Sequence, residues 1–243
     1  MAVERITYQA GSVTANGALV YDPSVSGRRP LLLVSPNWLG MTDESIERAE
    51  TMAGSKYVAF LADMYGDGKI ANGPPEAGPL ANGLREDAPE RRRRITAALD
   101  TLRRESDSRG IGDLTRQAAA GFCFGGGNVL ELARSGADVQ AVICLHGDLL
   151  TSMPARPGDI KAAVCIMHGS NDPVVPKKDR DAVEAELEAS GAKWQMLVFG
   201  GLLHSFCEPE SNVPGIGAYD AGAARQCFAM IDDFATAAFD KKL

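Results

Sequence analysis

The feature that most limits how this chain can fold is a series of short, largely apolar runs with helical patterns between several of them. The runs are LLLVSP from residue 31, YVAFLADMYG from 57, QAAAGF from 117, AVICLHG from 141, AAVCIMHG from 162 and WQMLVFG from 194. Apolar runs without alternation are typical of strands that are covered on both faces. Such strands, alternating with helices, predict an α/β fold with a doubly wound, mostly parallel sheet and helices on both faces.

The segments between these runs carry their own signals. Helices are expected from Thr42 or Asp43 to Gly54, over 86–106, over 127–135, over 177–190 with a stop at Gly191, and from about 220 to 239. Near the N-terminus, apolar and polar residues alternate, and Asn16-Gly17 breaks this alternation. The pattern predicts an antiparallel hairpin at the edge of the sheet, with its turn at Asn16-Gly17. The stretch 66–88 is rich in Gly, Pro, Asn and Ala and is predicted to be a long loop.

Length, composition and net charge limit the number of domains and the kinds of binding partner. A chain of 243 residues with 45% hydrophobic content can bury a full core, so a single domain over 1–243 is expected. The net charge of -7 disfavours binding to nucleic acid or to an anionic membrane surface. The basic block Arg91–Arg94 lies among carboxylates, which predicts a solvated helix face.

The N-terminal segment MAVERITYQAGS lacks the apolar core of a signal peptide, and no window is apolar enough to span a membrane. A cytoplasmic location is therefore expected. The five cysteines are irregularly spaced, which fits neither a disulfide framework nor a paired zinc motif, so they are interpreted as reduced thiols.

One of these thiols, Cys123, stands in GFCFGGG, directly after an apolar run and before a helical pattern. A strand, then Gly-x-[Ser or Cys]-x-Gly, then a helix is the pattern of a nucleophile elbow. The turn is so tight that small residues must flank the nucleophile. A helix N-terminus also favours thiolate over thiol. We therefore interpret Cys123 as a nucleophile, and Cys144, Cys165 and Cys227 as core residues.

Its partners are predicted from chain order, which in this architecture is nucleophile, acid, base. Asp172 in HGSNDPVVP follows the next-to-last apolar run, and His204 in GGLLHSF follows the last one. The sequence predicts that His204 takes the proton of Cys123 and that Asp172 orients the imidazole. His146 and His168 lie at strand ends and are expected to be hydrogen-bonded structural residues.

The thiolate would then attack the carbonyl carbon of an ester or lactone, and the oxyanion needs backbone donors. The N–H of Phe124, directly after the nucleophile, is one expected donor. The N–H of Trp38, in the loop after the first central strand, is the other. Water would hydrolyse the resulting thioester.

Together, GFCFGGG, GSNDPVVP and LLHSF resemble the dienelactone hydrolase family of α/β-hydrolases, over essentially the whole chain. The resemblance implies an α/β-hydrolase core without a large lid domain. It also implies a Cys-His-Asp triad on Cys123, His204 and Asp172, a small-molecule ester or lactone as substrate, no cofactor or metal, and a monomer.

Two positions depart from the family pattern. Members that act on dienelactone carry a glutamate where this chain has Asn37, and an arginine that grips the substrate carboxylate where this chain has Glu208. Arg85 or one of Arg91–Arg94 is a candidate replacement cation. We therefore expect a neutral ester or lactone to be the substrate.

Three alternatives stay open. Asn37 and Glu208 would also fit a non-catalytic relative that binds a small ligand in the old pocket. A metal hydrolase built on His146, Asp148, His168 and Asp172 is a weaker hypothesis, because their spacing matches no ligand motif. Thioesterase or peptidase activity is compatible with the same triad.

Overall fold

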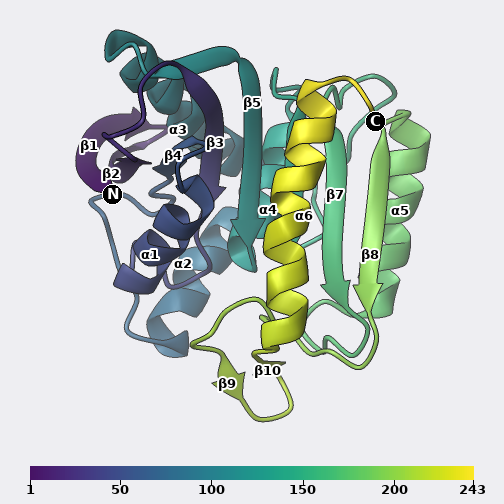
Figure 1. Cartoon of the computed structure of the whole chain (residues 1–243). Coiled ribbons are helices and arrows are strands. Elements are labelled where there is room, and N and C mark those ends of the chain that lie inside the picture. Colours follow the sequence, from purple (N-terminus) through teal and green to yellow (C-terminus); the bar gives the residue numbers. More distant parts are fainter. The chain divides into compact units, whose positions relative to one another are not determined.

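The computed structural model describes all 243 residues and has the predicted α/β architecture, with a mostly parallel sheet of eight strands. The strand order is β1-β2-β4-β3-β5-β6-β7-β8 (Figure 1). The strands are β1 Ala2–Ala10, β2 Val13–Tyr21, β3 Arg29–Ser35, β4 Val58–Leu61, β5 Gly112–Phe122, β6 Ala141–Leu145, β7 Ala163–Gly169 and β8 Trp194–Phe199. The six apolar runs thus supply β3 to β8, as predicted. No helix is long and apolar enough to cross a membrane.

The chain divides into two compact units, Met1–Ala119 and Ala120–Leu243, and β5 contributes to both. The first unit contains helices α1 Asp43–Ala53, α2 Pro74–Glu86 and α3 Ala88–Ser108. Thr42 caps α1 by accepting a hydrogen bond from the N–H of Ser45, at 3.2 Å. In this unit β3 and β4 pair in parallel, whereas β1, β2 and β4 pair antiparallel.

The turn of the N-terminal hairpin lies at Gly11-Ser12, so the turn predicted at Asn16-Gly17 is wrong. Gly11 has a φ of 60°, a left-handed conformation that glycine adopts without strain. Gly17 instead lies inside β2, opposite Ile6, where a Cβ would collide with the ring of Phe60. The glycine at this position serves close packing, which the dipeptide pattern could not distinguish from a turn.

The predicted loop over 66–88 is also partly wrong, because Pro74–Glu86 forms α2. Proline suits the first turn of a helix, whose N–H groups have no acceptor within the helix, and Pro74 stands there. Ala77, Ala81 and Leu84 are buried at helical spacing, so packing of this face outweighs the low helix propensity of the segment.

The basic block on α3 is only partly the solvated face that its composition predicted. The side chain of Arg93 is 59% exposed, whereas Arg91 is buried. Arg94 donates to a carboxylate oxygen of Glu90 at 2.9 Å and to the carbonyl oxygen of Met64 at 2.8 Å. Arg91 therefore belongs to the interior of the unit, and Arg94 ties α3 to the segment after β4.

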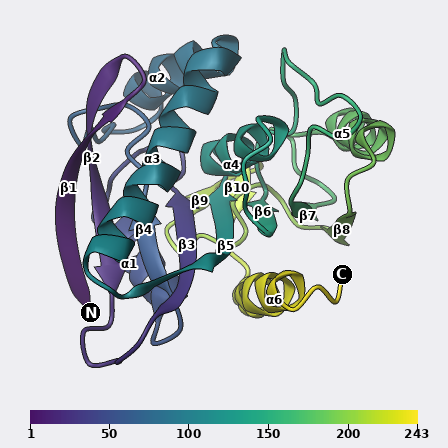
Figure 2. The same ribbon diagram turned by 90° about the horizontal axis from the view of Figure 1, so that it is seen from above.

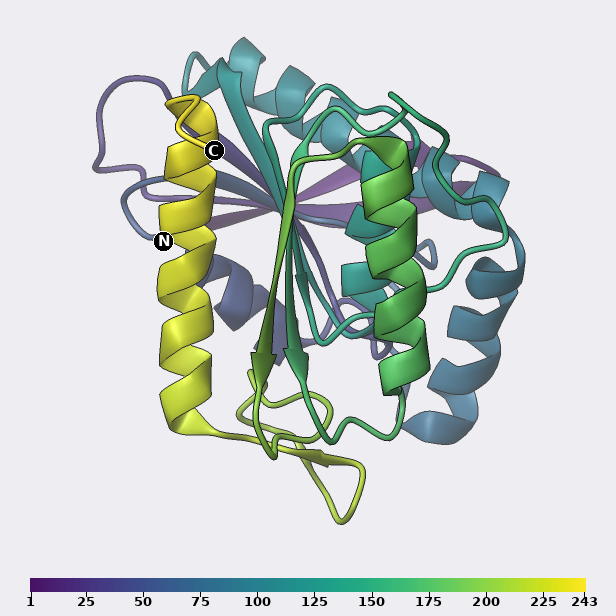
Figure 3. The same ribbon diagram turned by 90° about the vertical axis from the view of Figure 1, so that its right-hand side faces the viewer.

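The second unit contains helices α4 Phe124–Arg134, α5 Lys177–Ser190 and α6 Ala221–Phe239 and a small hairpin of β9 Asn212–Val213 and β10 Gly217–Ala218. Helices α4 and α5 cover one face of strands β6 to β8, and α6 covers the other (Figure 2). Gly191 ends α5 in a left-handed conformation, as predicted. The hairpin lies beyond the carboxyl ends of β7 and β8 (Figure 3).

Candidate active site

Cys123 occupies the turn between β5 and α4, and its backbone has φ 52° and ψ -121°. A non-glycine residue rarely adopts such a conformation, which costs of order 1–3 kcal/mol. A Cβ on Gly121 would collide with the carbonyl of Gly125, and one on Gly126 would lie 2.7 Å from the Cα of Gly147. The glycines around Cys123 are therefore required by close backbone approach in a strand-to-helix elbow.

The structure brings the three predicted triad side chains together in a chain of hydrogen bonds. The Nε2 atom of His204 lies 3.1 Å from the Sγ atom of Cys123, and its Nδ1 atom lies 2.7 Å from Oδ2 of Asp172. The second carboxylate oxygen of Asp172 accepts the N–H groups of Val174 and Val175, at 2.8 and 2.9 Å. Asp172 is thus held in place by the turn after β7.

Interactions within this line of hydrogen bonds shift the pKa values of His204 and Asp172. Burial alone would lower the pKa of His204, but the charge of Cys123 and hydrogen bonds with Asp172 and Cys123 raise this pKa well above 6.5. Burial would raise the pKa of Asp172, but the hydrogen bond and charge of His204 lower it. The arrangement therefore favours a carboxylate at Asp172 and an imidazolium at His204, in line with the sulfur of Cys123.

The other two histidines also lie near this line. His168 is hydrogen-bonded through Nε2 to the carbonyl of Val175, at 2.9 Å, and burial lowers its pKa. His146 accepts the backbone N–H of Cys123 through Nδ1, at 3.2 Å. Its ring centroid is 5.4 Å from that of His204. Sequence reasoning treated His146 as a structural residue, or as a ligand in the weaker metal-hydrolase alternative. Its position directly after β6 was the same signal that singled out the triad.

Glu208, predicted as a substrate-binding position, is buried in the second unit. One of its carboxyl oxygens, Oε1, lies 3.8 Å from Nε2 of His146. Its backbone N–H donates to the carbonyl of Ser205, at 3.0 Å. The structure therefore places Glu208 beside a second histidine of the site.

The β9-β10 hairpin holds the backbone of His204. The N–H of His204 donates to the carbonyl of Ile216 at 3.1 Å, and the N–H of Ala218 donates to the carbonyl of His204 at 3.3 Å. Val213, Ile216 and Tyr219 are exposed apolar residues of the same segment. The segment that fixes the backbone of His204 therefore also carries exposed apolar side chains.

The remaining predicted site residues, apart from Phe124, lie in the first unit. The Oδ1 atom of buried Asn37 accepts the N–H of Leu39 at 2.9 Å, and the carbonyl of Trp38 accepts the hydroxyl of Tyr65 at 2.9 Å. Arg85 lies on α2 and donates to Asn82 at 2.9 Å. Phe124 begins α4, so its N–H lies in the first turn of that helix. The roles assigned to these residues stay predictions.

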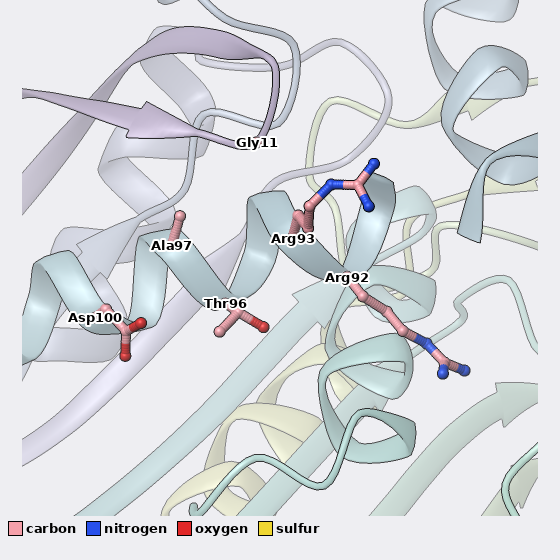
Figure 4. Close-up of a pocket in the computed structure, with 6 residues that line it drawn as sticks. All are labelled: Gly11, Arg92, Arg93, Thr96, Ala97 and Asp100. Carbon is pink, nitrogen blue, oxygen red and sulfur yellow. The ribbon is translucent and has the colours of Figure 1, made fainter. Parts of the chain in front are cut away.

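Two hollows in the first unit lie along α3. One, of about 410 Å³, is lined by Gly11, Arg92, Arg93, Thr96, Ala97 and Asp100, with the side chains of Arg92 and Arg93 pointing apart (Figure 4). The other, of about 490 Å³, contains Glu90 with Arg93 and Arg94 bound to it. In the second hollow, therefore, these charged groups bind one another.

The predicted metal-hydrolase alternative requires a cluster of ligands. No group of three or more His, Cys, Asp and Glu side chains has an arrangement that could hold a metal ion. His146, Asp148, His168 and Asp172 therefore do not form the ligand set that this alternative needs.

Residues 17–238 match the model of the dienelactone hydrolase family. The chain belongs to this family. The family match and the sheet order establish a hydrolase of the α/β-hydrolase fold.

Individual relatives of this dienelactone hydrolase family member agree with the match. A crystal structure of a dienelactone hydrolase-like promiscuous phosphotriesterase, P91, from metagenomic libraries is 34% identical, with a TM-score of 0.87 and 97% of each chain covered. A dienelactone hydrolase from Anabaena variabilis shares the fold at 19% identity and a TM-score of 0.66, with 96% of this chain and 95% of that one covered. An uncharacterized protein of Caenorhabditis elegans, K02A2.1, is 32% identical over 151 residues, which are 60% of this chain and 92% of that protein.

Proposed function

We propose that this member of the dienelactone hydrolase family hydrolyses a carboxylic ester or lactone through Cys123, His204 and Asp172. The observation that carries the proposal is the continuous line from Sγ of Cys123 through both ring nitrogens of His204 to Asp172, with separations of 3.1 and 2.7 Å. A thiol, an imidazole and a carboxylate in this order are the parts of a nucleophilic acyl-transfer site.

In the proposed mechanism, His204 holds the proton of Cys123 and the thiolate attacks the carbonyl carbon of the substrate. The electron pair of the carbonyl moves to its oxygen, where the N–H groups of Phe124 and Trp38 are the proposed donors. When the tetrahedral intermediate collapses, the C–O bond breaks and the leaving alkoxide takes the proton from His204. His204 then removes a proton from water, which attacks the thioester and releases the acid and the thiolate.

The proposed substrate is neutral. Asn37 and Glu208 stand where dienelactone-cleaving members have a glutamate and an arginine, so a substrate carboxylate would lack its cation. The proposed mechanism uses neither a cofactor nor a metal. The exposed apolar residues of the β9-β10 hairpin favour an apolar group on the substrate.

The test is hydrolysis of a panel of p-nitrophenyl esters and small lactones by wild type and by Cys123→Ala. We expect turnover by the wild type and a loss of at least about 10³-fold in kcat in the variant. Cys227→Ala is the matched control, because Cys227 is buried in α6 outside the triad. Equal rates for wild type and Cys123→Ala would remove Cys123 from the mechanism. No turnover on the panel, together with no reaction of Cys123 with iodoacetamide, would favour the non-catalytic ligand-binding alternative.

Phosphotriester hydrolysis is a second candidate, because the 34% identical relative P91 is described as a promiscuous phosphotriesterase. A thiolate can attack a phosphoryl group as it attacks an acyl group, with an aryloxide as the leaving group. Release of p-nitrophenol from a dialkyl p-nitrophenyl phosphate, lost in Cys123→Ala, would support this activity. Release that is unchanged in the variant would refute it.

A further inference from the structure

Outside the triad, the side chain of His146 contacts the backbone of the nucleophile. The backbone N–H of Cys123 points to Nδ1 of His146 at 3.2 Å and to the carbonyl of Leu145 at 3.0 Å. An imidazole nitrogen accepts a hydrogen bond only when it carries no proton. His146 in this contact is therefore the neutral ring with its proton on Nε2.

The Nε2 side of this ring faces Glu208. The Oε1 atom of Glu208 lies 3.8 Å from Nε2, and the two side chains are 0% and 3% exposed. This separation is too long for a hydrogen bond, but a carboxyl oxygen there still favours a proton on the nearer nitrogen electrostatically. Glu208 thus selects the tautomer that leaves Nδ1 available to Cys123.

The ring of His146 also packs edge to face against His204, at a centroid separation of 5.4 Å. It has the same separation from the ring of Phe206, on the segment that carries His204. A second positive charge at this distance would oppose the imidazolium form of His204. A neutral His146 is therefore compatible with the imidazolium form of His204, whereas a protonated His146 would oppose it.

The backbone of His146 is itself fixed in an uncommon conformation. Its φ is 38°, in the left-handed region that non-glycine residues seldom adopt. Its N–H donates to the carbonyl of Met167 at 2.7 Å. Strained residues persist where surrounding contacts hold them, and they gather at functional sites.

We propose that His146 is a positioning residue of the nucleophile, held by Glu208 in the tautomer that fixes the elbow of Cys123 and leaves the charge of His204 unopposed. The proposal deepens the proposed function and rests on it, because it assigns the support of the same nucleophile. His146 acts through Cys123 and His204 and does not itself take part in a bond change.

The test compares His146→Asn with His146→Gly. Asparagine tolerates the left-handed backbone and has a side-chain oxygen close to the position of Nδ1, so it can still accept the N–H of Cys123. Glycine adopts the same backbone without strain but offers no acceptor. Both variants remove the imidazole ring and tolerate the left-handed backbone. They differ in whether the N–H of Cys123 keeps a side-chain acceptor, so a difference in rate between them reports on this hydrogen bond.

For p-nitrophenyl acetate we expect His146→Gly to lose about 10- to 100-fold in kcat with a KM within about threefold of wild type. Alkylation of Cys123 by iodoacetamide at pH 7 should slow in parallel. His146→Asn should retain both rates within about fivefold of wild type, and Glu208→Gln should fall between the two. Equal losses in the Asn and Gly variants, or a change in KM alone, would show that His146 only fills space.

Nitrogen-15 NMR of the ring in the wild-type protein gives an answer even if a variant fails to fold. With only three histidines in the chain, the ring signals are readily assigned. A proton on Nε2 and none on Nδ1 is expected for His146, and a protonated Nδ1 would overturn the proposal. The NMR and alkylation results do not depend on turnover. If the wild type shows no turnover on the ester panel but gives the expected NMR and alkylation results, the proposed function is refuted and the positioning role of His146 is not.

Discussion

Cys123 and His204 show how single residues are set by their immediate surroundings. Cys123 is held at a φ of 52° by an elbow in which neighbouring glycines permit close backbone contact. His204 is buried, yet its pKa is raised because the charge of Cys123 and the contact with Asp172 outweigh burial. At this scale the orientation of one imidazole determines whether the line of hydrogen bonds from Cys123 to Asp172 forms.

Asp172→Asn tests that orientation. An asparagine amide can donate to Nδ1 of His204 and so favour the tautomer with Nε2 protonated and Nδ1 accepting. We expect kcat on the p-nitrophenyl ester panel to fall by about 10³- to 10⁴-fold. Asp181→Asn is the control, because Asp181 is exposed and pairs only with Lys177. Unchanged turnover in Asp172→Asn, with the fold intact by circular dichroism, would remove Asp172 from the triad.

At the scale of elements, turns and hairpins are tied to the helices and residues that they support. In the first unit, Glu90 of α3 accepts the N–H and the hydroxyl of Ser12, in the turn of the β1-β2 hairpin, at 2.8 and 2.6 Å. In the second unit, β10 binds the backbone of His204. Each contact joins segments that are distant in sequence or irregular in structure, so each can be tested by one substitution.

Glu90→Gln should destabilise the fold in a pH-dependent way. Burial would raise the pKa of Glu90, but hydrogen bonds from Ser12, Arg94 and Arg93 lower it from 4.5 to about 2. The ionised form therefore adds stability above pH 4.5 that is lost as the pH falls through about 2. We expect Glu90→Gln to lose about 2–3 kcal/mol of unfolding free energy at pH 7.

Urea unfolding of both proteins at pH 7, 5, 4 and 3 measures this difference, which should shrink below pH 5. Glu86→Gln, at an exposed position at the end of α2, should change the unfolding free energy by no more than about 0.5 kcal/mol. A difference between wild type and Glu90→Gln that stays constant across the pH series would contradict the proposed ionisation of Glu90.

Gly217→Ala tests the hairpin behind His204. A Cβ there would lie 2.8 Å from Oγ of Ser211 and 3.1 Å from the carbonyl oxygen of His204, so the segment must shift. We expect kcat/KM to fall roughly threefold to tenfold with little change in thermal stability. Gly200→Ala is the matched control, because its Cβ would meet nothing within 4 Å. Equal kcat/KM values for the two variants would show that the hairpin does not position His204.

Across the whole molecule, the five cysteines occupy different environments. Cys144 and Cys165 lie in β6 and β7, where burial raises the pKa of the first thiol to about 12 and of the second to about 11. Cys207 and Cys227 are fully buried, whereas Cys123 is 7% exposed. A reagent must reach a thiol before it can react, so we expect Cys123 to be the reactive cysteine of the native protein.

Alkylation of the native protein with iodoacetamide at pH 7 should therefore add one carbamidomethyl group, on Cys123. The same reaction after denaturation should modify all five cysteines. Peptide mass spectrometry locates the groups, and His204→Gln, which loses the imidazolium, should slow the native reaction at least about tenfold. Native labelling spread over several cysteines would contradict this selectivity.

The sequence by itself predicted the α/β class, all six central strands and the grouping of Cys123, Asp172 and His204. It could do so because strand burial, helix periodicity and the small residues of an elbow are local requirements that leave local patterns. Chain order then placed the acid and the base, since the carboxyl ends of parallel strands meet at one edge of a sheet.

Only the tertiary structure decided where glycine and proline serve turns and where they serve packing. Gly17 lies within β2 because of the ring of Phe60, and α2 forms across prolines because one of its faces is buried. Tertiary structure likewise brought Glu208 to His146 and His146 to Cys123, across sequence separations that no local pattern encodes. Contacts of this kind depend on how side chains from different elements fill shared space, which is fixed only when the elements pack.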